Sequence, residues 1–240
     1  LRRAALRAWG LSSDRLFFTL FSFFSFASPI FHFIFRFSRK LLKKCFLTMG
    51  SSLLLIMAWV MWLTGLPGCG KTTIAKKVRS RLQEKGIAVK ILQLDEIRRA
   101  ITPVPRYTEE ERDIVYASLA YMGYLLADAG VNVIIDATAN RRRYRDLARR
   151  LVPHFAEVHI RAPLPVCMER EAARNAEFSP KAIYKKAGTE KAPVPGVNVA
   201  YEEPLAPEIE VDTTSMSPEE SASYIAEMAL DLFRAPAADS

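Results

Sequence analysis

The chain has 240 residues and a formal net charge of +8, but the positive excess is confined to its first part. Residues 1–56 contain nine Lys or Arg and one acid, so residues 57–240 balance at 25 basic and 25 acidic residues. This neutrality argues against a nucleic-acid partner for the second part. Cys45, Cys69 and Cys167 lack metal-ligand spacing and an even disulfide framework, so we expect a reduced, cytoplasmic setting.

The basic, Phe-rich segment 1–56 is predicted to be an N-terminal extension. Within it, residues 16–35 are uncharged and long enough to cross a bilayer as a helix of about 30 Å. The same run contains several Ser and is biased in composition. Two interpretations stay open: a membrane segment at 16–35, or sequence upstream of the true start, since Met57 directly precedes the first strand. We expect residues 57–240 to form the domain that carries the chemistry.

From residue 57 onward, apolar runs typical of strands alternate with amphipathic helical patterns. This alternation predicts an α/β fold, with a parallel sheet of about five strands and helices on both faces. The Pro-rich, charged stretch 178–207 is long for a loop, so it is predicted to be a lid. The predicted strands are 58–64, 88–94, 131–136, 156–161 and 208–212. The predicted helices are 71–86, 109–129, 141–152, 164–174 and 217–234.

A phosphate-binding loop follows the first predicted strand. Gly65–Thr72 fits the pattern G-x-x-x-x-G-K-[ST] and lies between a strand and a helix, as the motif requires. The fold is therefore predicted to be of the P-loop NTPase type, with ATP held by backbone N–H groups. Lys71 is predicted to reach the β- and γ-phosphates, and the Thr72 hydroxyl to ligate magnesium. The ATP-binding residues predicted here are Gly65, Leu66, Pro67, Gly68, Cys69, Gly70, Lys71, Thr72 and Thr73.

Asp95 lies at the end of the second predicted strand. Ligands bind beyond the carboxyl ends of strands in open α/β sheets, so this carboxylate is expected in the site. It can orient an acceptor hydroxyl, take its proton or hold magnesium through water. A cap on the next helix is the alternative interpretation. Arg98, one helical turn further on, is a candidate ligand for a substrate phosphate or sulfate.

Asp136 ends the third predicted strand and brings a second carboxylate to the same edge. Two roles stay open for it: holding magnesium, or capping Arg142 or a helix. Six arginines follow between Arg141 and Arg150. They spread around several faces of a helix, so most are predicted to be solvated and at most two to reach a ligand.

Several collinear segments resemble the adenylylsulfate kinase (APS kinase) family. The resemblance covers Trp59 to Phe233, and its most specific parts lie in the predicted lid. The segments are Leu63–Ala75, Leu125–Gly130, Phe155–Val158, Pro163–Arg170, Lys181–Ala187, Pro195–Pro204 and Glu208–Thr213. The resemblance implies transfer of the γ-phosphoryl group of ATP, with magnesium, to the 3′-hydroxyl of adenosine 5′-phosphosulfate (APS). The product would be 3′-phosphoadenosine 5′-phosphosulfate (PAPS). A homodimer is left open.

The resemblance also implies roles for individual residues. Asp95 and Lys71 would be catalytic, and Arg170 would join the loop in binding ATP. The residues expected to bind the acceptor are Asp95, Arg98, Tyr107, Arg112, Thr138, Lys181 and Lys185. Among these, Arg98 and Arg112 would hold anionic groups, Tyr107 would stack on adenine, and the two lysines would close with the lid.

The chain departs from the family pattern where the acceptor is held. Gln93 replaces the first Asp of Asp-Gly-Asp, and Val115 replaces the Asn of Arg-x-x-Asn. Ala139 replaces the Ser of an Ile-Ser-Pro loop, and Val194 an expected aromatic residue. Asp136 resembles the Asp-x-Thr of other small P-loop kinases. A kinase for another hydroxyl, on a small molecule or a nucleic-acid end, is therefore the alternative enzyme. A nucleotide-binding switch that hydrolyses ATP slowly is the alternative outside catalysis.

Overall fold

The computed structural model describes residues 58–174, 178, 180, 182–189 and 193–234. The predicted extension 1–56, with its candidate membrane segment 16–35, lies outside these residues, and so does Lys181. Among the helices of the described ranges, none is both long and apolar enough to cross a membrane.

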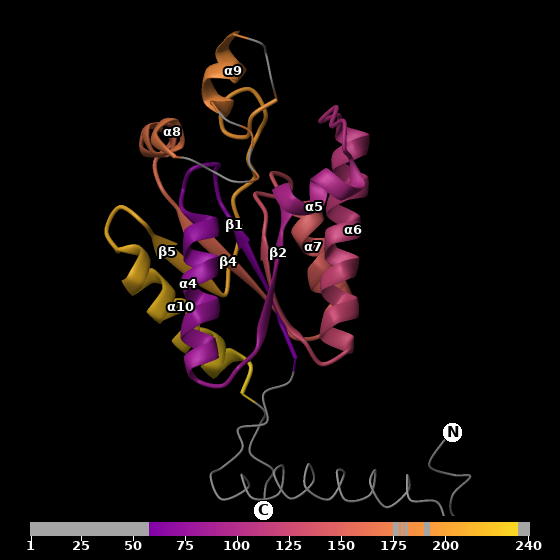
Figure 1. Ribbon diagram of the computed structural model, residues 1–240, viewed down its shortest axis with the longest axis vertical. Helices are drawn as coiled ribbons and strands as arrows, with labels where there is room; N and C mark the ends of the chain where they lie inside the picture. Colours follow the sequence, from indigo (N-terminus) through magenta and orange to yellow (C-terminus); the bar gives the residue numbers. More distant parts are fainter. Residues whose placement is uncertain (1–57, 175–177, 179, 181, 190–192, 235–240) are drawn as a thin grey trace, which may run out of the picture. The chain divides into compact units, whose positions relative to one another are not determined.

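Five parallel strands form one sheet in the order β2-β3-β1-β4-β5 (Figure 1). In the central pairs, Val60 lies opposite Val133 on one side and Phe155 on the other. The predicted α/β class and parallel sheet are confirmed, and each predicted strand lies within two residues of its position. The strands are β1 (Val60–Thr64), β2 (Val89–Gln93), β3 (Asn132–Asp136), β4 (Phe155–Arg161) and β5 (Ile209–Asp212).

Helices cover both faces of the sheet, as predicted, with α4 and α10 on one face and α6 and α7 on the other (Figure 1). Two short helices, α5 and α9, were not among those predicted. The first follows β2 without a loop, and the second lies within the stretch 178–207 that was predicted as an irregular lid. The helices are α4 (Lys71–Glu84), α5 (Leu94–Ile101), α6 (Glu109–Asp128), α7 (Arg142–Leu151), α8 (Leu164–Ala173), α9 (Ile183–Thr189) and α10 (Pro218–Leu232).

The central strand β1 divides two hydrophobic cores. Successive side chains of a strand point to opposite faces. Met61 and Leu63 accordingly pack with α4 and α10, whereas Val60 and Trp62 pack with α6 and α7. All five β1 residues are buried. Strand β1 is therefore fixed from both sides, and the loop that leaves its carboxyl end starts from a rigid position.

Candidate active site

A cavity of about 830 Å³ lies beyond the carboxyl ends of β1, β2 and β3. It brings together most of the residues predicted for the site. Those that line it are Pro67, Gly68, Gly70, Lys71, Thr72, Thr73, Asp95, Arg98, Tyr107, Arg112, Asp136, Thr138 and Arg170. The predicted residues Gly65, Leu66, Cys69 and Lys185 are described but are not part of its lining.

The phosphate loop is pressed against neighbouring backbone at two glycines. A Cβ atom on Gly65, whose φ is +148°, would lie 2.2 Å from the carbonyl oxygen of Ile160. A Cβ atom on Gly68, with φ +86°, would lie 2.3 Å from the carbonyl oxygen of Cys167. Both distances exclude a side chain, and both φ values favour glycine. These contacts fix the loop against the end of β4 and the start of α8.

Lys71 begins α4 and lies under the loop, with only 8% of its surface exposed. Its Nζ donates to the carbonyl oxygens of Gly65, at 2.9 Å, and Leu66, at 3.0 Å. The side chain of Cys69 is buried beside this ammonium group, and burial raises the pKa of its thiol. The thiol is therefore neutral, and Lys71 supplies the positive charge at this end of the cavity.

Thr72 and Asp136 form a close pair at the floor of the cavity. The Thr72 hydroxyl donates to Oδ2 of Asp136 at 2.6 Å. Burial raises the pKa of the Asp136 carboxyl, and the charge of Lys71 opposes this shift. Asp136 does not cap α7: the amide of Arg142 donates to the Glu202 carboxylate at 2.8 Å. The hydroxyl and carboxylate oxygens of the pair are the ligand types that Mg²⁺ prefers.

Asp95 lies in the first turn of α5 and lines the cavity. The residue that caps this helix is Gln93, so the alternative prediction that Asp95 is the helix cap is wrong. The side chain of Asp95 is partly exposed and approaches the cavity from β2, whereas Asp136 approaches it from the neighbouring strand β3. A carboxylate just beyond the end of β2 and one at the end of β3 thus border the same space.

Arg98 and Tyr107 form the cavity wall beyond Asp95, and Glu111 holds the Arg98 side chain from behind. The NH1 atom of Arg98 donates to Oε1 of Glu111 at 2.7 Å, and the Arg98 Cζ atom lies 5.0 Å from the ring centroid of Tyr107. Tyr107 has a φ of 56°, an uncommon value for a residue with a side chain. Burial raises the pKa of the Tyr107 phenol. An aromatic ring and a guanidinium group therefore form one face of the cavity.

Arg112 connects three segments at the far side of the cavity. Its NH1 donates to Oδ1 of Asn140 at 3.3 Å, and its NH2 to the carbonyl oxygen of Pro193 at 2.9 Å. It is 8% exposed and lies on α6. Thr138, on the loop after β3, lines the cavity and accepts a hydrogen bond at its carbonyl oxygen from Thr64.

Arg170 lies on α8 and is tied to Thr213, the residue after β5. It donates to the Thr213 hydroxyl at 2.7 Å and to the Thr213 carbonyl oxygen at 2.9 Å. The Thr213 hydroxyl also lies 3.1 Å from the carbonyl oxygen of Cys69 in the phosphate loop. Arg170 is thereby held beside the loop.

The lid lysines differ from the prediction. Lys181 lies outside the described residues, and Lys185 is exposed and does not line the cavity. Its neighbour Lys186 lines the cavity instead, on the next position of α9. One residue of a helix is a rotation of about 100°, so without an expected helix the sequence did not show which lysine faces inward.

Sequence reasoning missed several residues at the cavity and in the layer behind it. The additional lining residues include Tyr116, Arg174, Phe178 and Lys186, and the cavity is also lined by Gln93 and Val194, which were named only as departures from the family pattern. Most of the arginines after Arg141 are partly or fully exposed, as predicted, but Arg145 is buried, with 1% of its surface exposed. Its position on the inward face of α7, next to the buried Ala148, was the available signal.

The chain matches known proteins over most of the region described above. A family model described as adenylylsulphate kinase matches residues 57–212. The chain is 36% identical over 175 residues to a probable adenylyl-sulfate kinase of Pyrococcus abyssi, covering 72% of this chain and 96% of the relative. It is 38% identical over 165 residues to an adenylyl-sulfate kinase of Rippkaea orientalis, covering 68% and 87%. The Mycobacterium tuberculosis APS kinase solved with AMPPNP and APS superposes with a TM-score of 0.64 at 27% identity, covering 72% and 98%.

Proposed function

The chain belongs to the adenylylsulfate kinase family, and from this premise we propose that it transfers the γ-phosphoryl group of ATP to the 3′-hydroxyl of APS, giving PAPS and ADP. The observation that carries the proposal is the shared cavity. Lys71 and Thr72 border it from the phosphate loop, and Asp95 borders it from the first turn of α5, directly after β2. A phosphate donor and a hydroxyl acceptor can meet there with in-line geometry, as phosphoryl transfer requires.

On the donor side, backbone N–H groups at the start of α4 and the positive end of its dipole would hold the phosphates of ATP. Lys71 would exchange its bonds to two loop carbonyls for bonds to the β- and γ-phosphates. Arg170, held by Thr213, would contact the nucleotide from α8. Thr72 and Asp136 would hold Mg²⁺, which would neutralise charge on the phosphates.

On the acceptor side, Asp95 would orient the hydroxyl and accept its proton, since a carboxylate can act as a general base at hydrogen-bonding distance. Arg112 would hold an anionic group of APS, and Thr138 would border it. Tyr107 would stack on the adenine, with Arg98 behind its ring. Because Arg98 already pairs with Glu111, contact with the substrate would require sharing that guanidinium group.

We also propose the setting in which the enzyme works. Lys185 and Lys186 would close with α9 over the substrates and exclude water, and Lys181 is proposed to act with them.

The enzyme would act in the cytoplasm as a homodimer, without a nucleic-acid partner. The extension 1–56 is proposed to be dispensable for chemistry. Light scattering of the full chain and of a chain starting at Met57 would test the assembly.

The direct test is ADP release by the full chain and by a chain starting at Met57, each with ATP and Mg²⁺, with and without APS. We expect release to depend on APS, and PAPS to appear in equal amount. A panel of sugars, aminoglycosides and a 5′-hydroxyl oligonucleotide serves as the comparison. Turnover with one of these compounds and none with APS would show that this compound, and not APS, is the acceptor. Slow ADP release that no acceptor stimulates would favour a switch.

A further inference from the structure

The loop between β3 and α7, residues 137–140, has all four of its carbonyl oxygens bound by side chains or backbone from other elements. This loop carries Thr138 on the cavity wall and Asn140, which accepts from Arg112. The four donors come from β1, α7 and the later part of the stretch 178–207. They are Trp62 to Ala137 at 3.0 Å, Thr64 to Thr138 at 2.6 Å, Arg145 to Ala139, and the amide of Glu202 to Asn140 at 2.8 Å.

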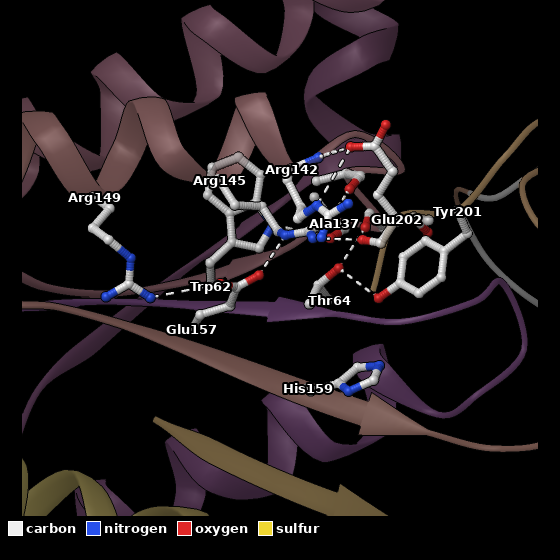
Figure 2. Close-up of polar contacts among 12 residues, drawn as sticks. Trp62, Thr64, Ala137, Arg142, Arg145, Arg149, Glu157, His159, Tyr201 and Glu202 are labelled. Carbon is white, nitrogen blue, oxygen red and sulfur yellow. Dashed lines mark hydrogen bonds and ion pairs between the residues drawn. The ribbon is translucent and has the colours of Figure 1, made fainter. Parts of the chain in front are cut away.

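Arg145 is the residue that joins this loop to the return segment, defined here as residues 200–202. Its NH1 donates to the carbonyl oxygen of Ala139, and its NH2 to that of Glu202 at 2.6 Å. Its Nε faces Oε1 of Glu157 in an ion pair, and its Cζ atom lies 5.9 Å from the ring centroid of Tyr201. Figure 2 shows the guanidinium group between Glu157 and Glu202. The planar fork of arginine allows these contacts simultaneously.

Arg145 and Glu157 are 1% and 6% exposed, so both charges are buried. Burying an ion pair costs much of what its attraction returns, and an apolar pair of the same volume often serves stability equally well. The contacts of Arg145 indicate a different use. Two of its donors bind carbonyl oxygens of two segments that lie far apart in the chain and are hydrogen-bonded to each other behind the cavity wall.

Loop 137–140 borders the acceptor side of the cavity through Ala137 and Thr138, and the return segment packs against this loop without lining the cavity. Asn140 also donates to the carbonyl oxygen of Ala200 at 3.2 Å, and the Tyr201 hydroxyl lies 3.0 Å from that of Thr64. The stretch just before the return segment contributes Pro193 and Val194 to the cavity lining. A change in the spacing between the loop and the return segment would therefore change the width of the acceptor side. The phosphate loop has no contact with Arg145 among the bonds described.

We propose that Arg145, with Glu157 as its counterion, is a positioning residue that sets the distance between loop 137–140 and the return segment, and so the affinity for the acceptor. The inference rests on the proposed function only for the identity of the acceptor. Arg145 does not border the cavity and acts through Ala139 and Glu202. Its loss should weaken acceptor binding and leave ATP binding unchanged.

The test is Arg145→Lys in the full chain. Lysine keeps the charge beside Glu157 but cannot donate to both carbonyl oxygens in the geometry of a planar fork. We expect KM for APS to rise at least about tenfold, the scale of one lost charge-assisted hydrogen bond. The dissociation constant for ATP should change less than about twofold. Arg145 makes none of the described bonds to the phosphate loop, and a tenfold change would require the loss of a charge-assisted hydrogen bond there.

Arg149→Lys is the matched control. Arg149 lies on the same helix and also faces Glu157, at 3.5 Å, but its other partner is Glu208 at the exposed side, and it contacts neither segment. We expect KM for APS to stay at its original value in this variant. Glu157→Gln is the second test, because glutamine keeps the shape and removes the counterion. Glu157→Gln should also raise KM for APS, but by less than Arg145→Lys does.

Hydrogen exchange gives a readout that does not depend on the acceptor. In Arg145→Lys the amides of Ala139 and Glu202 should exchange faster, while the β1 amides stay protected. Equal changes in KM for APS and in ATP affinity, or unchanged exchange at these two amides, would overturn the positioning role. If the original chain does not phosphorylate APS but the two amides respond as expected, the proposed function fails and the positioning role stands.

Discussion

The two sides of the cavity are built in different ways. The phosphate loop is formed by consecutive residues, and its glycines allow contact with the backbone of Ile160 and Cys167. Loop 137–140 on the acceptor side is held by donors that are remote in sequence, such as Trp62, which is 75 residues from its partner. The comparison shows that a site can combine a part specified locally with a part specified by long-range contacts. Substitutions on the two sides should therefore have different effects on catalysis, substrate affinity and stability.

Lys71→Ala should have the largest effect, and on the phosphate side alone. It removes the charge that would lie on the transferring phosphates, so we expect kcat to fall by roughly 10³-fold or more. Steady-state ADP release, with circular dichroism to check the fold, measures this. Normal turnover in the variant would mean that the loop is not the site.

Asp95→Asn should lower kcat by about 10²–10⁴-fold, the usual contribution of a general base, while ATP affinity changes little. Asp136→Asn, assayed beside it, is the matched comparison, because both carboxylates border the cavity beyond the ends of the paired strands β2 and β3. Asp136→Asn is expected to weaken Mg²⁺ binding, so that half-maximal turnover needs a higher Mg²⁺ concentration. If Asp136→Asn is crippling and Asp95→Asn is mild, the acceptor assigned from the family is wrong.

Gly65→Ala should destabilise the fold through the close backbone contact of the phosphate loop. The new Cβ would lie 2.2 Å from the carbonyl oxygen of Ile160. We expect the free energy of unfolding to fall by roughly 1–3 kcal/mol more than in Gly86→Ala, because overpacking adds to the strain of positive φ. Gly86 is the control, with φ +78° and no atom within 4 Å of an added Cβ. Equal losses of unfolding free energy in Gly65→Ala and Gly86→Ala, measured by urea unfolding, would contradict a destabilising contact at Gly65.

Tyr201→Phe should have the smallest effect, and it should change the affinity for the acceptor and not that for ATP. It removes the hydroxyl that lies 3.0 Å from Thr64, while Thr64 keeps its bond to Thr138. The expected loss is about 1 kcal/mol in the free energy of unfolding, with a rise in KM for APS of less than about tenfold. A change in ATP affinity instead would show that the two sides are not independent.

Local patterns predicted the sheet, the major helices and the phosphate loop. Each of these depends on short-range periodicity or on one motif. The pairing of Arg145 with Glu157 was missed because two helical residues with similar charge, Arg145 and Arg149, differ only in the face they present. The short helix α9 was missed because seven residues carry too little periodicity, and with it the inward position of Lys186.

The acceptor side illustrates the limit more generally. Asp136 could be placed at the cavity from its strand, but its bond with Thr72 depends on the distance between two strand ends. Likewise, Asp95 was expected at the sheet edge, and its position inside the first turn of α5 follows from a helix that starts without a loop. The sequence indicated which side chains reach the carboxyl edge of the sheet. Which partners they bind depends on the three-dimensional packing and could not be predicted.

The stacked rings of Trp59 and Phe233 also bear on how the domain can be rebuilt. Their centroids are 5.2 Å apart, which brings the residue before β1 next to the residue after α10. This contact lies at the amino end of the sheet, whereas the cavity lies at the carboxyl end. A short linker between these two points would close the domain into a ring. The exposed turn at Gly86 then offers a place to open it as a circular permutant, away from both substrates.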